Sequence, residues 1–350
     1  DPVRTGTLAA LDPTGVNTWQ GARLPTQVDK DGKPLVTIVQ SDSRAILSWN
    51  RFDVGANTTL NFEQKLNGVA QPGWVALNRV ANSVAPSRVL GSITADGTVA
   101  VINSRGVVFE KGSQVNLHSL LVSSLDIGGF TTRKLIDPTD VNSSLADAVA
   151  TIADRNLTFL ASGLQSSVAV DGKPIYLVSS VLNAVDNFTN IPSEGGITID
   201  RGATVNAIGG GFIIATAPSV SNAGILSAPE GQVSLQAGRA IAYAVSTGAA
   251  TTTDIVTGIG PDVRGLVLRS WFGLDGAVAN SGLVDVPRGY ISLGTGEGGT
   301  VTNLGLLAST TSVARNAKIS LTGGTILLGD KTNASGIVVT PDTNGETVPI

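Results

Sequence analysis

The chain has 350 residues and a formal net charge of −4, and charged residues make up only 14% of it. This charge lacks the basic footprint of a nucleic-acid-binding protein, and the absence of cysteine excludes disulfides, thiolate metal sites and cysteine nucleophiles. Because no run of about 18 uncharged apolar residues occurs, the sequence predicts no membrane-spanning helix, and it contains no recognisable signal peptide.

The apolar residues are mostly small or β-branched. Hydrophobic residues make up 42% of the chain, but aromatic residues only 4%, and 42 glycines are spread along its length. Val, Ile, Leu and Ala suit short strands that pack in a narrow interior. Frequent glycine suits many turns.

The amino-terminal part is expected to alternate turns with short strands. Breakers lie at residues 12–15 and 31–34, and residues 17–28 fit a strand or a loose cap. Four strands are predicted, at residues 35–39, 45–49, 52–54 and 58–62. In the last of these, Leu60 and Phe62 fall on one face and Thr59 and Asn61 on the other.

Residues 74–127 continue this pattern. Glycines at 91, 97, 106 and 112 break the segment into short apolar runs, and no helical period lasts longer than a turn. Residues 142–153 differ, because Leu145, Ala148, Val149 and Ile152 follow a helical spacing. We expect a short helix there, as an excursion from a repetitive body.

The chain becomes repetitive after Gly195. The pattern V-x-N-x-G followed by two apolar residues occurs at 220–226, 278–284 and 301–307, and GSQVN at 112–116 is echoed by GATVN at 202–206. Asn280 and Asn303 are 23 residues apart, which fits one coil of a β-solenoid. Asn222 and Asn280 are 58 residues apart, an interval that is expected to hold two or three coils.

The repeated Asn-x-Gly sites are interpreted as coil corners rather than ligand sites. Asn at a corner can take the left-handed conformation and bond its own backbone, and the nearby glycine removes the Cβ penalty there. Stacked asparagines can also form side-chain ladders.

Residues 249–269 interrupt the repeat and are expected to form a loop or a side hairpin. Loops that stand off a rigid body are where binding residues concentrate. The candidate partner-binding residues are Thr253, Asp254 and Asp262; a plain surface loop is the alternative.

The sequence offers little catalytic chemistry. The single histidine, His118, has no second histidine or cysteine as a companion and is expected at a coil corner or partly buried. A carboxylate-based carbohydrate enzyme is the alternative, but its acids would be scattered at Asp254, Asp262, Asp275 and Asp285. We predict that the chain is not an enzyme and that it binds no cofactor and no metal.

Residues 35–127 resemble a known family. The segments that carry the likeness are SWNRFDVGANTTLNF, VALNRV, SRVLGSITADGTVAVIN and GVVFEKGSQVNLHSLLVSSLDI. They resemble the amino-terminal two-partner secretion domain of exoproteins and adhesins of the filamentous haemagglutinin type. That family usually has an Asn-Pro-Asn-Gly turn here, whereas this chain has Asn103-Ser104-Arg105-Gly106, which keeps the asparagine and glycine that a type I turn favours. The family's Asn-Pro-Asn-Leu motif has no counterpart.

The resemblance implies an all-β fold, a right-handed parallel β-helix with an amino-terminal cap and extra-helical hairpins. It also implies a secretion-signal domain of an exported bacterial surface exoprotein, which passes the periplasm, engages a dedicated outer-membrane transporter and nucleates β-helix folding outside the cell. Candidate residues for transporter recognition, or for building the cap, are Trp49, Asn50, Phe52, Asn78, Arg79, Asn103, Ser104, Arg105 and Gly106.

Three regions are expected along the chain. Residues 1–130 would form the cap and secretion-domain core, 131–194 a continuation of the β-helix with a helical or loop excursion, and 195–350 repetitive coils with a loop excursion near 249–265. The chain is expected to be a monomer that binds no nucleic acid. Binding of a host surface protein, a glycan or a haem carrier is a second hypothesis, and a β-helical polysaccharide lyase or hydrolase a third.

Overall fold

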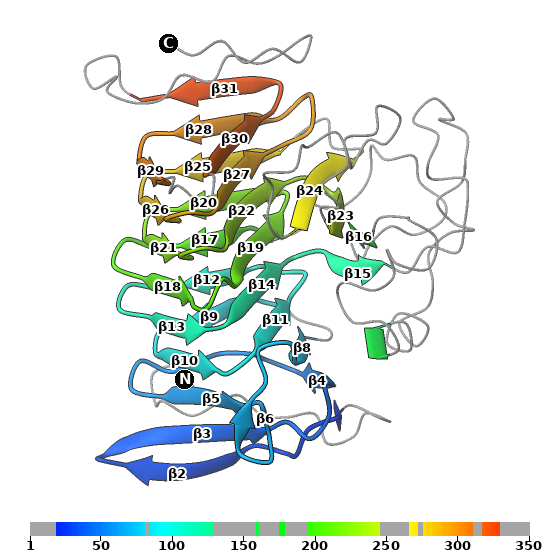
Figure 1. The fold of residues 1–350 in the computed structure, drawn as a ribbon, viewed down its shortest axis with the longest axis vertical. Helices are drawn as coiled ribbons and strands as arrows, with labels where there is room; N and C mark the ends of the chain where they lie inside the picture. The colour runs from blue at the N-terminus through cyan, green and yellow to red at the C-terminus, as the bar shows by residue number, and fades with distance from the viewer. Residues whose placement is uncertain are drawn as a thin grey trace.

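In the computed structural model the chain winds into a stack of coils (Figure 1). The structure describes residues 19–80, 84–128, 159–160, 175–178, 195–245, 266–271, 276–310 and 317–329. From Ser87 onward each coil contributes one strand to each of three sheets, and strands of successive coils pair in parallel. The predicted right-handed parallel β-helix is confirmed.

The three sheets of the solenoid are named here by number. Sheet 1 contains, in order, β1 (Trp19–Gln20), β4 (Arg44–Trp49), β8 (Val75–Val80), β11 (Thr98–Ile102), β14 (Ser119–Ser123), β19 (Phe212–Ala217), β22 (Gln232–Ala237), β27 (Tyr290–Gly294) and β30 (Lys318–Thr322). Sheet 2 contains β2 (Thr26–Lys30), β3 (Lys33–Val39), β5 (Thr59–Glu63), β10 (Ser92–Ala95), β13 (Gln114–Leu117), β18 (Thr204–Ala207), β21 (Ile225–Ser227), β26 (Leu283–Asp285) and β29 (Leu306–Ala308). Sheet 3 contains β9 (Ser87–Val89), β12 (Val107–Phe109), β17 (Ile197–Ile199), β20 (Ser219–Asn222), β25 (Ala277–Asn280), β28 (Thr300–Asn303) and β31 (Thr325–Leu328).

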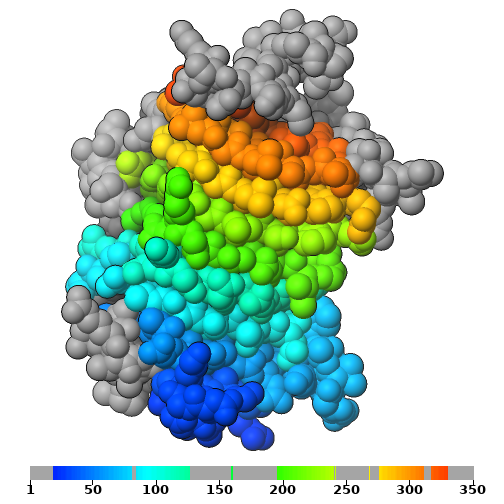
Figure 2. Space-filling view, turned by 90° about the vertical axis from the view of Figure 1, so that its left-hand side faces the viewer, coloured from blue at the N-terminus to red at the C-terminus, as the bar shows by residue number. Residues whose placement is uncertain are grey.

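Figure 2 shows the coils as stacked bands, on the side of the solenoid that is turned to the left in Figure 1. The chain runs from sheet 3 to sheet 2 to sheet 1 within a coil, as in β9, β10 and β11, and then begins the next coil with β12. Side chains therefore stack on their equivalents about 4.8 Å away. The echo of GSQVN in GATVN is such a pair, since Val115 lies beside Val205 and Asn116 beside Asn206.

The interior of the coils is a continuous apolar core. Leu60 and Phe62 are fully buried while Thr59 and Asn61 face outward, as the alternation predicts. Large aromatic side chains fill the first coils, and Val, Leu, Ile and Ala fill the later ones. Burying one such aliphatic side chain contributes about 1.5–3 kcal/mol.

The predicted strands at 35–39, 45–49 and 58–62 are confirmed as parts of β3, β4 and β5. The strand predicted at 52–54 is wrong, because only Val54 pairs, in an isolated parallel bridge with Val89. Two antiparallel strands cover the amino-terminal end of the stack, with β1 on β4 and β2 on β3. A small hairpin joins β6 (Lys65–Leu66) to β7 (Val69–Ala70).

An antiparallel side sheet stands beside the solenoid (Figure 1). Its order is β15 (Asp126–Gly128), β16 (Ile175–Val178), β23 (Ala240–Val245) and β24 (Leu266–Trp271). The pairing of β23 with β24 confirms a side hairpin around the predicted excursion. Buried Ile241 and Leu268 join Ile46, Leu77 and Leu121 of sheet 1 in a second apolar core, which attaches the side sheet to the solenoid.

The side hairpin corrects one predicted spacing. Asn222 of β20 lies beside Asn280 of β25, so these residues occupy adjacent coils. The prediction of two or three coils between them is wrong, because β23 and β24 leave the solenoid within that interval. The helix predicted at residues 142–153 lies outside the described residues.

The Asn-x-Gly corners form a ladder, although not with the expected backbone. Nδ2 of Asn222 donates to Oδ1 of Asn280 at 2.7 Å, and Nδ2 of Asn280 donates to Oδ1 of Asn303 at 2.7 Å. The predicted left-handed conformation of these asparagines is wrong, since none has a positive φ. The glycines serve close approach instead: a Cβ on Gly282 would lie 2.1 Å from the carbonyl oxygen of Gly224.

The ladder predicts a graded loss of stability. Asn280→Ala removes the middle rung, so Nδ2 of buried Asn222 and Oδ1 of half-buried Asn303 lose their bonds to it, and we expect the free energy of unfolding to fall by about 2 kcal/mol. Asn303→Ala, at the half-buried end of the ladder, should cost roughly half as much. Urea unfolding followed by circular dichroism measures both losses. Equal losses of stability for the two variants would contradict the graded effect.

Candidate recognition site

The segment after β4 begins with two residues that build the first coil. Trp49 is fully buried, and its Nε1 donates to Oδ1 of Asn78 at 3.0 Å. Its ring meets Phe52 edge to face at a centroid distance of 5.5 Å and Trp19 at 5.1 Å. Of the candidates in this segment, Trp49 and Phe52 are therefore internal, and only Asn50 is exposed.

Asn78 is also internal. Its Nδ2 donates to the carbonyl oxygens of Ala76 and Ala100, both at 3.2 Å, so the amide is satisfied inside the solenoid. Neighbouring Arg79 points to the opposite face of β8, where its Nη2 lies 2.9 Å from Oδ1 of Asp126. Both charges are buried, and they join sheet 1 to the first strand of the side sheet.

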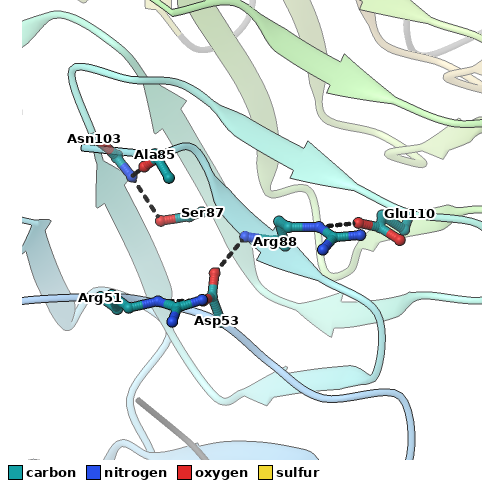
Figure 3. A network of polar contacts seen from close by, with 7 residues as sticks. All are labelled: Arg51, Asp53, Ala85, Ser87, Arg88, Asn103 and Glu110. Carbon is teal, nitrogen blue, oxygen red and sulfur yellow. Dashed lines mark hydrogen bonds and ion pairs between the residues drawn. The ribbon is translucent and has the colours of Figure 1, made fainter. Parts of the chain in front are cut away.

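Asp53 attaches the same segment to sheet 3 (Figure 3). Its carboxylate accepts a bond from Nε of Arg51 at 2.9 Å and one from the backbone N–H of Arg88 at 2.8 Å. Val54 continues the pairing, because its N–H donates to the carbonyl of Arg88 at 2.9 Å. Residues 51–54 therefore occupy the edge of β9 and satisfy its backbone.

Arg88 extends this polar row towards the next coil. Its Nε donates to Oε1 of Glu110, just after β12 (Figure 3). The hydrogen bond to Glu110 raises the pKa of Arg88 above its usual value, and the charges of Glu110 and Asp53 act in the same direction. Arg88 therefore stays charged at any physiological pH.

The turn at residues 103–106 is attached to the same strand. The N–H of Gly106 donates to the carbonyl of Asn103 at 2.8 Å, which closes the predicted turn. Oδ1 of buried Asn103 accepts the N–H of Arg105 at 2.9 Å. In Figure 3, Nδ2 of Asn103 donates to Oγ of Ser87 at 2.9 Å and to the carbonyl of Ala85 at 3.2 Å.

Gly106 is required by the packing at this turn. Its φ is 97°, and a Cβ would lie 2.2 Å from the carbonyl oxygen of Gly196 in the next coil. Ser104 is half-buried and Arg105 is exposed. A proline at position 104 is therefore not needed, because the side chain of Asn103 itself fixes the turn.

Strand β9 thus connects the two candidate segments. Residues 51–54 bond to one side of it, and Asn103 bonds to Ser87 and to the carbonyl of Ala85, two residues before the strand. We call segments 50–54, 85–88 and 103–111 together the clasp. Sequence reasoning singled out the segment SWNRFDVG, which contains Asp53, but it missed Ser87, Arg88 and Glu110 as site residues.

Of the remaining candidate residues, His118 lies within the described part of the chain and the three loop residues do not. His118 is half-buried between β13 and β14, as predicted for a coil corner, and burial lowers its pKa below 6.5 more than its bond with Ile208 raises it. Thr253, Asp254 and Asp262 lie outside the described residues. Within the described ranges, no cluster of three acidic or histidine side chains could hold a metal, and no helix has the length and hydrophobicity to span a membrane.

A model of the family described as the TPS (two-partner secretion) domain matches residues 9–193, more than half of the chain. The chain belongs to this family. It is a secretion domain of an exoprotein that is exported by way of the periplasm through an outer-membrane transporter to the cell surface or medium.

Two relatives illustrate how far the likeness extends. The chain is 32% identical over 100 residues to a heme/hemopexin-binding protein of Haemophilus influenzae, which is 29% of this chain and 10% of that protein. The chain thus spans about a tenth of the curated relative's length. The solved HMW1 secretion domain of Haemophilus influenzae aligns with 87% of this chain and 62% of its own, at a TM-score of 0.54 and 17% identity, and so supports the fold alone.

The single histidine gives the folded chain a pH dependence. Because its pKa is lower in the folded than in the unfolded state, the unfolded chain binds more protons as pH falls below about 6.5. We expect the contribution of His118 to the free energy of unfolding to be complete above about pH 6.5 and to decrease as the pH falls through the pKa of the folded state. NMR titration of the imidazole should give a midpoint below 6.5, and His118→Gln should remove this contribution; a midpoint at or above 6.5 would contradict it.

Proposed function

We propose that the clasp is the part of this secretion domain that its outer-membrane transporter recognises. The proposal is supported by the connection through β9, which places the two segments that resemble the family in one folded unit. A partner that reads one segment would therefore read the other in a fixed position. Because the hydrogen bonds of Asn103 and Asp53 already fix both segments before a partner binds, less conformational entropy is lost on recognition.

Within the clasp, buried and exposed residues have different roles in this proposal. Trp49, Phe52 and Asn103 build the surface from beneath, since all three are buried. Asn50 and Arg105 are exposed, and Ser104 is half-buried, so these side chains lie at the surface that a partner would meet. Arg79, buried with Asp126, would act only by holding the side sheet.

The separation of roles leads to a direct test. Asn50→Ala/Arg105→Ala should lower the thermal midpoint less than Asn103→Ala does and reduce the secreted fraction about fivefold, because both substituted side chains lie on the exposed surface. Asn103→Ala should lose about 2 kcal/mol of stability, because Ser87 and two backbone groups lose their partner. Secretion is measured in cells that co-express the transporter.

Asn57→Ala/Arg201→Ala is the matched control, because it removes the same two residue types from exposed positions outside the clasp. It should be secreted as wild type. If the Asn50→Ala/Arg105→Ala variant is also secreted as wild type, the clasp serves only to build the fold.

A second function concerns the exoprotein as a whole. The likeness to a heme/hemopexin-binding protein favours capture of haem or of a haem carrier over other cargo activities. Host surface proteins and glycans are the remaining candidate partners, and the excursion around residues 249–265 is where we place such contacts. Binding of haemin by the purified chain, seen in its absorbance, would favour this function.

A further inference from the structure

In two ion pairs of the clasp the cation is more exposed to solvent than the acid that it pairs with. The Arg51 side chain is 49% exposed and its partner Asp53 only 3%. The Arg88 side chain is 45% exposed and its partner Glu110 22%. Each pair is neutral, but its positive end faces outward.

Two other ion pairs of the described residues are arranged differently. Arg79 and Asp126 are both buried, at 9% and 8% exposed. Arg288 and Glu230 are exposed almost equally, at 41% and 38%. The outward orientation of the guanidinium groups therefore distinguishes the clasp from these pairs.

The segments of the clasp contain two further cations. Arg105 in the turn and Lys111, which follows Glu110, are exposed. The segments of the clasp thus contain four cations and two acids, Asp53 and Glu110, neither of them exposed. This local excess of accessible positive charge is opposite in sign to the whole chain, whose formal charge is −4.

The chemistry of arginine indicates what such a surface binds. A guanidinium group has five N–H donors in a planar fork and can hold a second carboxylate in addition to a first. Arg51 directs Nε and Nη2 at Asp53, and Arg88 directs Nε at Glu110, so both side chains keep further donors. Because the paired acids fix each guanidinium group, little side-chain entropy is lost when a partner binds.

We propose that Arg51 and Arg88 bind carboxylates of an acidic segment in the periplasmic part of the transporter. This inference rests on the proposed function of the clasp and names the chemistry of its partner. Exposed charges of this kind accelerate encounter and select orientation, and their effect weakens as salt screens them.

The test compares two variants that keep hydrogen-bonding side chains. Arg51→Gln/Arg88→Gln removes the two charges of the clasp, and Arg288→Gln removes a similarly exposed and paired arginine elsewhere. Binding to the purified periplasmic region of the transporter is measured at ionic strengths of about 0.05 M and about 0.5 M. We expect the clasp variant to bind about tenfold more weakly at low salt, with a reduced salt dependence, and the control to bind as wild type.

Arg51→Lys/Arg88→Lys separates charge from folding, since it should retain most of the binding and of the salt dependence. Unchanged binding by the glutamine variant would overturn the inference and leave the proposed function intact. If the wild-type chain does not bind the transporter region at all, the proposed function itself fails.

A parallel measurement distinguishes protein carboxylates from other anions. The wild-type chain is tested with vesicles rich in phosphatidylglycerol and with inorganic phosphate. Binding to either that equals binding to the transporter region, and that the glutamine variant loses equally, would show a general anion site and overturn the assignment to an acidic protein segment.

Discussion

In-register pairing between successive coils is the constraint on which the rest of the molecule depends. A single coil has no sheet of its own and cannot bury its apolar side chains, so each strand depends on the equivalent strand of the neighbouring coils. Register also places every side chain inside or outside the solenoid, because a slip of one residue would exchange the two faces. The narrow interior then requires small aliphatic residues, and the corners require glycine wherever backbones approach closely.

The first coils need additional contacts, because the stack begins there and no earlier coil of the described residues covers them. The aromatic group of Trp19, Trp49 and Phe52 fills the interior beneath the antiparallel cap. Asp53 satisfies the edge of sheet 3 that would otherwise meet solvent. Residues that resemble a recognition motif therefore also start the fold, and the two roles meet in the same short segment.

Repeats and alternation were sufficient to predict the coils. The three Asn-x-Gly sites stack as expected, since identical corners in a solenoid pack on one another. The interval of 58 residues from Asn222 to Asn280 led to a wrong number of coils, because a sequence pattern does not reveal which residues leave the solenoid for the side sheet. The left-handed conformation predicted for the asparagines was wrong for a different reason. Glycine is required at these corners because a carbonyl oxygen of the neighbouring coil lies too close for a Cβ, and only the stacked structure reveals this contact.

The candidate site was predictable only in part. Resemblance identified the right segments, but it could not separate buried Trp49 and Asn78 from exposed Asn50 and Arg105. Nor could it find the bond from Arg88 to Asp53, because the two residues are 35 positions apart in the sequence and only the coil brings them together. Long-range contacts of this kind follow from register rather than from local composition.

Hydrogen–deuterium exchange of the domain, with and without the periplasmic region of its transporter, tests the central claim most directly. The account predicts additional protection of backbone amides in residues 50–54, 85–88 and 103–106 when the transporter region is bound. Protection confined to the side sheet or to the coils after Gly195, with these three segments unchanged, would contradict it.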